Sequence, residues 1–430
     1  MWRTHSCVPR RDSYRRKSGI DTSVDAARRG RAPRYPTLCM PPLTGLRVLD
    51  FSHALAGPYC TMLLAQYGAE ILKIEDPGSG DVGRSWGPPF IGDEASYFLG
   101  LNAGKRSVAI DLKKPEGLEL CLDLAANSDI LIENMRPGTM TRLGLGYEAA
   151  RARNPRLIYC AISGYGQTGP DRDVTAMDLI VQASSGLISV TGVEGGEKVR
   201  SGHSVGDITA GMFAIIGIQL ALEARHRTGE GQFVDVSMQD GMISAMASNY
   251  AFYFGAGVVP EPLGTRFATI VPYRGYLTKD REIVIAVASQ KLWRIFCAAI
   301  GRADLADNPD YATNPLRVAN RKVLEPIIEQ ILRTRTSEEW AKIFAEFGIP
   351  CSPVRNLEEV VNDPQSAARE MFPAAGASRI TGPPVKLSAT PGEPQHAAPK
   401  LGADTRSTLA ELLDLDGAAL DALARCGAIS

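Results

Sequence analysis

From Leu46 onward, short runs of aliphatic and β-branched residues alternate with stretches of helical pattern, and this alternation constrains the fold most strongly. Runs such as Arg47–Phe51, Glu70–Glu75 and Asp129–Glu133 have the length and composition of buried strands. A helical stretch at 115–126 and several glycines separate them. Strands that alternate with helices are typical of a parallel α/β sheet, so we predict a Rossmann-like large domain. Further strands are expected at 107–112, 156–162 and 233–237, and a long helix from Asp207 to about His226.

The character of the chain changes after Pro260. A predicted strand pair at 270–277 and 282–287 precedes helices around Trp293 and Trp340. These elements indicate a second, smaller α+β domain. We therefore expect five segments: 1–40 as a disordered extension or mis-assigned start, 41–240 as the first part of the large domain, 241–262 as a linker, 263–360 as the small domain, and 361–430 as a linker that returns to the large domain.

The first 39 residues differ from the rest because they are crowded with arginine and have almost no apolar periodicity. Such a composition predicts disorder. Asp12, Asp21 and Asp25 argue against an organelle transit peptide, and no apolar run supports a secretory signal. Ordered patterning begins directly after Met40, so we expect the true start there.

Charge and cysteine usage exclude several classes of protein. The chain has 47 Lys and Arg against 48 Asp and Glu, a formal net charge of -1, so no global field attracts nucleic acid or an anionic membrane surface. The eight cysteines lie far apart without a C-x-x-C pair, which indicates reduced thiols in a cytoplasmic protein. The longest apolar stretch, 208–224, contains Thr209, Gln219 and Glu223, so we expect no membrane span.

No cofactor or metal motif is complete. The turn at 52–58 has a single glycine, so the G-x-G-x-x-G dinucleotide fingerprint is missing. The stretch 100–106 resembles a Walker A loop, but one residue between the glycines is missing and Arg106 stands where a hydroxyl would hold magnesium. The five histidines show no metal-ligand spacing. We therefore expect no metal and no permanently bound cofactor.

A series of separated motifs carries the functional signal. They are Gly45–Phe51, Ala56-Gly-Pro58, Leu72–Glu75, Asn102-x-x-Lys105-Arg-Ser107, Glu133-Asn134, Gly166–Pro170, Gly206-Asp207, Thr228-Gly-x-Gly-Gln232, Gly348–Val354 and Leu401-Gly402. Together they resemble the class III CoA-transferase family, of the formyl-CoA and carnitine CoA-transferase type, over nearly everything after residue 42. Two stretches, Arg84–Phe90 and Ile270–Tyr273, are similar to the succinyl-CoA:dicarboxylate branch, which includes the glutarate enzyme.

The resemblance implies that Asp207 is the nucleophile, because the family uses an aspartate that opens a long helix after a glycine-rich stretch. A carboxylate there faces unpaired N–H groups and the positive end of the helix dipole. The same position is typical of a residue that only caps the helix, so both interpretations stay open. In the implied mechanism Asp207 attacks the acyl-CoA thioester to give an anhydride and then an aspartyl-CoA thioester, from which a small carboxylate takes coenzyme A.

The resemblance also implies which residues contact coenzyme A. Arg136 and Arg142 are the natural phosphate partners, although a pair of solvated arginines would give the same pattern. Asp76 stands where formyl-CoA transferases have an arginine, so the adenosine phosphate contact from that position is in question. The implied set is Leu55, Ala56, Ile110, Asp111, Leu112, Lys113, Asn134, Met135, Arg136, Arg142, Val174, Thr175, Ala176 and Met177.

A dicarboxylate acceptor needs a partner for its second carboxylate, because that group loses hydration in a partly dry cleft. Gly195-Gly196 is a candidate flap over the intermediate, or a plain turn. The family forms homodimers of interlocked chains, so the resemblance implies a homodimer. The candidate partners for the second carboxylate, each also compatible with a surface charge, are His53, Arg84, Arg266 and Arg274.

Two other functions compete with CoA transfer. An α-methylacyl-CoA racemase shares this fold and pairs a histidine with the aspartate matching Asp207. Met177 fills the histidine position here, and a thioether carries no proton near neutral pH, although Asp178 is next to it. The second alternative is a non-catalytic acyl-CoA binding protein, against which the presence of Asp207 and the glycine loops argues.

Overall fold

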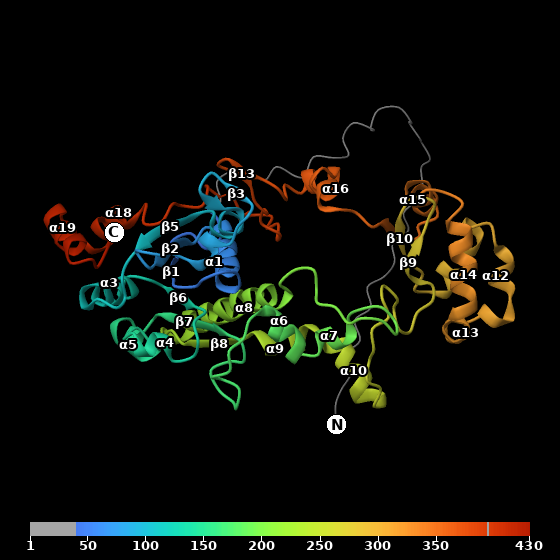
Figure 1. Ribbon diagram of the computed structural model, residues 1–430, viewed down its shortest axis with the longest axis horizontal. Coiled ribbons are helices and arrows are strands. Elements are labelled where there is room, and N and C mark those ends of the chain that lie inside the picture. Colours follow the sequence, from blue (N-terminus) through green and yellow to red (C-terminus); the bar gives the residue numbers. More distant parts are fainter. Residues whose placement is uncertain (1–39, 394) are drawn as a thin grey trace, which may run out of the picture. The chain divides into compact units, whose positions relative to one another are not determined.

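The computed structural model describes residues 40–393 and 395–430, so the predictions for residues 1–39 lie outside the described ranges. Six parallel strands form the main sheet in the order β5-β2-β1-β6-β7-β8 (Figure 1). The order reverses between β1 and β6, as in doubly wound α/β folds. The bounds are β1 Arg47–Asp50, β2 Glu70–Glu75, β5 Lys105–Ala109, β6 Ile130–Glu133, β7 Ile158–Ser163 and β8 Phe233–Ser237.

Strand β5 is displaced from its predicted position at both ends. We expected 107–112, but β5 begins at Lys105, which pairs with Ile71 of β2, and ends at Ala109. The sequence pattern placed the start of this strand too late because a lysine is typical of a loop, whereas the Lys105 ammonium is buried against Asp50. A buried ion pair of this kind is invisible in local sequence.

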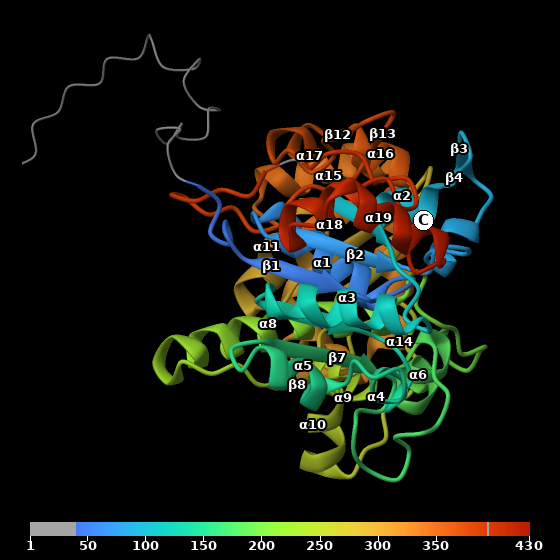
Figure 2. The ribbon, with the colours of Figure 1, turned by 90° about the vertical axis from the view of Figure 1, so that its left-hand side faces the viewer.

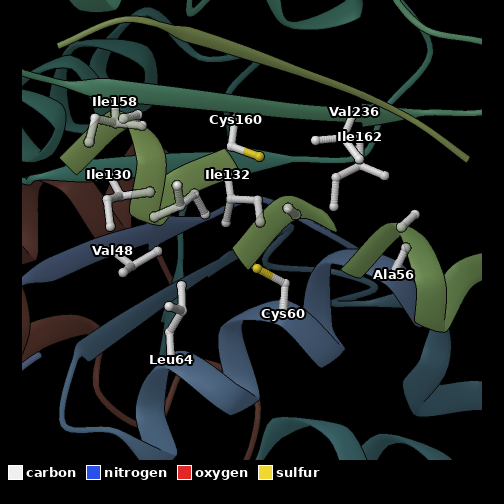
Figure 3. Close-up of a cluster of buried hydrophobic side chains, with 14 of the residues drawn as sticks. Val48, Ala56, Cys60, Leu64, Ile130, Ile132, Ile158, Cys160, Ile162 and Val236 are labelled. Atoms are coloured by element: carbon white, nitrogen blue, oxygen red, sulfur yellow. The ribbon is translucent and has the colours of Figure 1, made fainter. Parts of the chain in front are cut away.

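Helices cover both faces of the sheet. On one face, α1 (Ala56–Gln66) and α8 (Val205–Thr228) pack against β-strand side chains such as Ile132, Ile158 and Ile162 (Figure 3). On the other face lie α3 (Pro115–Ala126), α5 (Tyr147–Arg153) and α18 (Thr405–Leu413), and Figure 2 views the side that carries α3 and α18. Strands buried on both faces read as continuous apolar runs, which explains their clear signal in the sequence.

The long helix α8 begins two residues before the predicted start. Its N-cap residue is Ser204, so Asp207 lies in the first turn and not at the opening position. Ala210, Ala214 and Ile218 are buried on its sheet-facing side. By length and composition alone, α8 is also apolar enough to cross a membrane, and in this fold it packs on α1, β7 and β8.

The stretch from Val271 to Pro353 has its own antiparallel sheet and apolar core. Strands β9 (Tyr273–Leu277), β10 (Glu282–Ala286) and β11 (Cys351–Pro353) pair in the order β11-β10-β9. Trp293, Phe296 and Phe344 are fully buried in the core beside it. The helices here are α11 Gln290–Ala299, α12 Ala303–Asp307, η2 Pro309–Tyr311, α13 Asn314–Ala319, α14 Arg321–Leu332 and α15 Ser337–Glu346.

Shorter elements connect these parts. They are η1 Val82–Ser85, β3 Phe90–Ile91, β4 Glu94–Ala95, α2 Ser96–Asn102, α4 Thr139–Arg142, α6 Asp178–Ser184, α7 Leu187–Val190, α9 Met238–Ala245, α10 Ala247–Ala256, α16 Leu357–Val361, α17 Pro364–Ala368, β12 Ala374–Ala375, β13 Ser378–Arg379 and α19 Gly417–Arg425. The C-terminal part of the chain returns to the main sheet at the start of α18, where the Ala109 N–H of β5 donates to Thr405 Oγ1 at 2.9 Å.

Candidate active site

A cavity of about 710 Å³ lies at the carboxyl ends of the central strands. Its walls include His53 after β1, Asn134 after β6 and Ser163 at the end of β7. The sheet order reverses between β1 and β6, and ligands of open α/β sheets bind in the crevice at such a point. The topology and the cavity therefore indicate the same site.

The loop after β1 is tied to the loop after β6 by a pair of hydrogen bonds. The His53 N–H donates to Asn134 Oδ1 at 2.8 Å, and Asn134 Nδ2 donates to the His53 carbonyl at 2.8 Å. Next to them, Ala54 has a φ of 63°, a left-handed conformation that is costly for a residue with a Cβ. Its N–H donates to Asp81 Oδ1 at 3.0 Å. These contacts hold the cavity wall in one conformation.

A network of buried charges supports this loop. Lys105 Nζ is 3.1 Å from Asp50 Oδ2, and Lys73 Nζ is 2.8 Å from Asp81 Oδ2. Lys73 also donates to the Ser52 carbonyl at 2.7 Å. Burial alone would raise the pKa of Asp50, but Lys105 and Lys73 hold it well below its usual range. The loop therefore rests on ionised side chains that bulk water does not reach.

Asp207 lines the cavity from the first turn of α8. The N-cap residue Ser204 makes no cap hydrogen bond through its side chain. Instead, Asp178 at the start of α6 accepts the Gly206 N–H at 2.8 Å and the Asp207 N–H at 3.4 Å. Within the described ranges the Asp207 carboxylate itself accepts no hydrogen bond, so helix capping is not its role in this structure.

The surroundings of Asp207 make it an unusual carboxyl group. Burial, and then the neighbouring Asp178, raise the pKa of Asp207 to about 7. Tyr97 lines the same cavity, and its pKa is raised by burial and by the charge of Asp207. The rings of Trp86 and Tyr97 pack with centroids 5.1 Å apart in this wall. A poorly solvated carboxylate is more basic than one in water, which favours nucleophilic attack.

Comparison with known proteins now identifies the family. The model of CoA-transferase family III matches residues 43–405. The chain belongs to CoA-transferase family III. This confirms the family that the motifs resemble, and the chain is accordingly a CoA-transferase.

Relatives of this family III enzyme match along most of their length. It is 38% identical over 395 residues to a succinyl-CoA:glutarate CoA-transferase of Mus musculus, with 91% of each chain covered. It is 39% identical over 390 residues to a succinyl-CoA:mesaconate CoA-transferase of Haloarcula hispanica, covering 87% of this chain and 96% of the relative. A crystal structure of a CAIB/BAIF family protein from Brucella suis is 34% identical, covers 87% of this chain and 100% of that one, and has a TM-score of 0.80. The mixed α/β fold with a large parallel sheet is thereby confirmed.

Only part of the predicted coenzyme A set lines the cavity of this family III enzyme. Leu55 is adjacent to the wall, Arg142 donates to Thr139 Oγ1, and Ile110 forms a bridge with Ile429 beyond the end of β5. The residues outside the cavity lining are Leu55, Ile110, Asp111, Leu112, Lys113 and Arg142. The residues that line it are Ala56, Asn134, Met135, Arg136, Val174, Thr175, Ala176 and Met177.

Most candidates for the second carboxylate partner are engaged elsewhere. Arg84 binds Glu75 through two hydrogen bonds of 2.8 Å, at the end of β2, and does not line the cavity. Arg266 and Arg274 each donate to Glu325 at 2.8 Å in a separate pocket. Each of the three guanidinium groups is thus already paired with a buried carboxylate, and their role as partner of a second substrate carboxylate stays a prediction.

The remaining carboxylate candidate, His53, and the candidate flap at Gly195-Gly196 have different positions. His53 lines the cavity, where burial and Lys73 lower its pKa, so near neutral pH it offers a neutral imidazole and not a charge. Gly195 and Gly196 lie in the tight turn between the bridged residues Gly192 and Lys198, outside the cavity lining. A flap role for the two glycines stays a prediction.

Sequence reasoning missed several residues of the site. Arg172 and Arg200 line the cavity, as do the aromatic residues Trp86 and Tyr97. Trp86 lies in the branch-like stretch 84–90 and Arg200 stands shortly before the Gly206-Asp207 motif, so their positions carried a weak signal. In the part of the chain that the structure describes, no cluster of three or more His, Cys, Asp and Glu side chains has the arrangement of a metal site.

Proposed function

We propose that this enzyme moves coenzyme A from an acyl-CoA, with succinyl-CoA as the donor, to a small dicarboxylate, and that Asp207 is the nucleophile. The observation that carries the proposal is the Asp207 carboxylate in a cavity of about 710 Å³, where it accepts no hydrogen bond from the described residues and its pKa is raised to about 7. A volume of this size accommodates the acyl end of a thioester together with a small acid. A capping aspartate would instead be engaged with the backbone.

The proposed reaction balances without any further reagent. An Asp207 carboxylate oxygen attacks the thioester carbon and the carbon–sulfur bond breaks. CoA departs as the thiolate, and an acyl-aspartyl anhydride remains on the enzyme. The thiolate attacks the Asp207 carboxyl carbon, which releases the donor as a carboxylate and leaves an aspartyl-CoA thioester. The acceptor carboxylate then attacks the aspartyl-CoA thioester, which releases CoA thiolate and forms an anhydride between the acceptor and Asp207. The thiolate attacks the acyl carbon of the acceptor, so acceptor acyl-CoA departs and the Asp207 carboxylate is regenerated.

The cavity also supplies what these intermediates need. Anhydrides and thioesters hydrolyse if water reaches them, so exclusion of water preserves the activated acyl group. Trp86, Tyr97 and Met177 give the cavity wall an apolar character, although Trp86 and Met177 are 39% and 63% exposed, so exclusion of water requires that a bound substrate or a second chain cover them. Arg136 is exposed at the cavity and is the candidate partner for the phosphates of coenzyme A, since guanidinium groups bind phosphate oxygens in a bidentate manner.

A dicarboxylate acceptor is supported by the relatives and by the cations of the site. Glutarate and mesaconate, named as substrates of two relatives, are both dicarboxylates. Arg200 lines the cavity and has no ion-pair partner among the described residues, whereas Arg172 is 3.5 Å from Asp173. We therefore assign the second carboxylate to Arg200, in place of the engaged Arg84, Arg266 and Arg274.

We expect Arg200→Gln to raise the KM for succinate and glutarate by about tenfold, because a charge-assisted hydrogen bond contributes about 1.5 kcal/mol or more. The KM for butyrate, which lacks the second carboxylate, should stay unchanged. Steady-state transfer from succinyl-CoA to succinate, glutarate, malate, itaconate and butyrate measures both.

Arg227→Gln is the matched control, because Arg227 is an exposed arginine at the far end of α8. If wild-type enzyme uses butyrate as well as succinate, the dicarboxylate assignment is wrong and only CoA transfer survives. If Arg200→Gln and Arg227→Gln behave alike, the assignment to Arg200 is wrong.

The proposal includes a homodimer in the cytoplasm. Met212, Ile216 and Leu220 lie four residues apart on α8 and are 48%, 51% and 67% exposed, an apolar stripe that a second chain would cover. We expect light scattering to give twice the mass of the chain at all concentrations down to the nanomolar range, because separation of interlocked chains requires unfolding. A monomer would contradict this part of the proposal.

A further inference from the structure

The start of α8 is capped from outside the helix. The first N–H groups of an α-helix have no partner within it, and a Ser at the N-cap commonly supplies one. Ser204 does not, and Asp178 of α6 takes this role by accepting the N–H groups of Gly206 and Asp207 at 2.8 and 3.4 Å. The cap therefore comes from a residue that is also part of the cavity wall.

A glycine permits this close approach. A Cβ on Gly206 would stand 3.0 Å from Asp178 Oδ1, tighter than side chains normally pack. A glycine directly before Asp207 therefore has a steric role, because it lets the Asp178 carboxylate reach the N–H groups at the start of α8.

The second oxygen of the same carboxylate is also held. Gln182 Nε2 donates to Asp178 Oδ2 at 2.6 Å, and Gln182 Oε1 accepts the Ser201 N–H at 2.9 Å. Gln182 is fully buried, so both of its contacts are protected from water. A continuous chain of hydrogen bonds thus joins the start of α8, helix α6 and the segment that carries Arg200.

We propose that Asp178 is a positioning residue for CoA transfer: it satisfies the start of α8 and fixes its place, so that the Asp207 carboxylate stays unengaged and oriented toward the thioester. This inference rests on the proposed nucleophilic role of Asp207. It assigns Asp178 a function other than that of a proton-carrying base.

The charge of Asp178 has a consequence for pH dependence. The other titratable and charged groups at the cavity are His53 after β1, Tyr97 of α2, and Arg136, Arg172 and Arg200. Burial and Asp178 raise the pKa of Asp207, so the nucleophile is protonated below about pH 7 and kcat/KM should fall as the pH drops through that value. Removing the negative charge of Asp178 lowers the Asp207 pKa and moves this fall to lower pH.

Three variants separate position from charge. Asp178→Ala removes both, and we expect kcat to fall at least about tenfold across the pH range, because small misplacements of a reacting group cost this much. Asp178→Asn keeps an acceptor for Gly206 but removes the charge, so the acidic limb should move down by about one pH unit. In Asp178→Asn the new amide group faces the Gln182 amide, which donates on that side. Combining Asp178→Asn with Gln182→Glu places a carboxylate at position 182 that accepts hydrogen bonds from both the new amide and the Ser201 N–H. The kcat of this double variant at pH 8 should therefore exceed that of Asp178→Asn alone.

The pKa of Asp207 can also be measured without turnover, beside the pH profiles of kcat/KM. Titration of ¹³C-carboxyl-labelled aspartate by NMR follows the Asp207 resonance, which is assigned by its loss in Asp207→Asn. The inference is overturned if the Asp207 pKa is the same in wild type and Asp178→Asn, or if Asp178→Ala transfers CoA at the wild-type rate. If Asp178→Ala does not fold, the other two variants still decide.

The proposed function fails separately from this inference. If Asp207→Asn keeps the wild-type transfer rate, the nucleophile is wrong, whatever the Asp178 variants show. If Asp207→Asn is inactive and the Asp178→Asn titration is unmoved, only the positioning role is wrong.

Discussion

Asp207→Asn should reduce CoA transfer to below about 1% of the wild-type rate, because loss of a covalent nucleophile removes several kcal/mol of transition-state stabilisation. The amide has the shape of the carboxyl group but forms no anhydride. Folding should be retained, since the carboxylate accepts no hydrogen bond within the described ranges and Asp178 caps the helix. Steady-state transfer from succinyl-CoA, with circular dichroism as a check of the fold, measures the effect.

Asp240→Asn provides a closely matched control. Asp240 is the third residue of α9 after a Ser N-cap, as Asp207 is of α8, but it is exposed and does not line the cavity. This variant should transfer CoA at the wild-type rate. More than about 1% residual activity in Asp207→Asn would remove Asp207 as the nucleophile.

The second large effect concerns stability. We expect Asp50→Ala to lower the free energy of unfolding by about 3–5 kcal/mol, because it leaves the buried Lys105 ammonium without its counter-charge. Asp50 is fully buried and also accepts hydrogen bonds from the Ser52 N–H at 2.9 Å and from Thr61 Oγ1 at 2.7 Å. Urea denaturation measures the loss, and transfer activity should fall with it because the loop that carries His53 rests on this network.

A double-mutant cycle tests the cause of that loss. Lys105→Met removes the stranded cation, so Asp50→Ala combined with Lys105→Met should be less destabilised than the two single changes added together. Burial lowers the pKa of Lys105 to about 8 despite the attraction of Asp50, so loss of Asp50 removes the charge that helps to keep this lysine protonated near neutral pH. Strict additivity, or a cost of Asp50→Ala below about 1 kcal/mol, would mean that the pair does not support the loop.

The sheet was predictable where apolar residues form a short continuous or alternating run. Glu70–Glu75 and Phe233–Ser237 have the predicted bounds, and helix α3 begins at Pro115 as expected because proline favours a first turn. The start of β5 was missed because Lys105 is neutralised by Asp50, 55 positions away. The final helix, Gly417–Arg425, was missed as well, and only its packing beside α18 reveals it.

The site was predictable only as far as local motifs reach. The Gly206-Asp207 motif led to a residue that lines the cavity, but whether Asp207 caps its own helix depended on Asp178, which lies 28 positions before Gly206 along the chain. Arg84 looked like a free cation until β2 and the turn after it brought Glu75 to its guanidinium. Long-range pairing of charges cannot be read from residue type or spacing, and for that reason Arg200 replaces Arg84 as the candidate acceptor contact.

Peptide mass spectrometry of enzyme incubated with succinyl-CoA alone and then quenched in acid tests directly whether Asp207 carries coenzyme A. We predict that coenzyme A is attached as a thioester to the peptide that contains Asp207. This adduct should be absent from Asp207→Asn and should be lost from the wild type when a dicarboxylate acceptor is added before the quench. An enzyme that transfers CoA while this peptide stays unmodified, or that carries coenzyme A on another residue, would contradict this prediction.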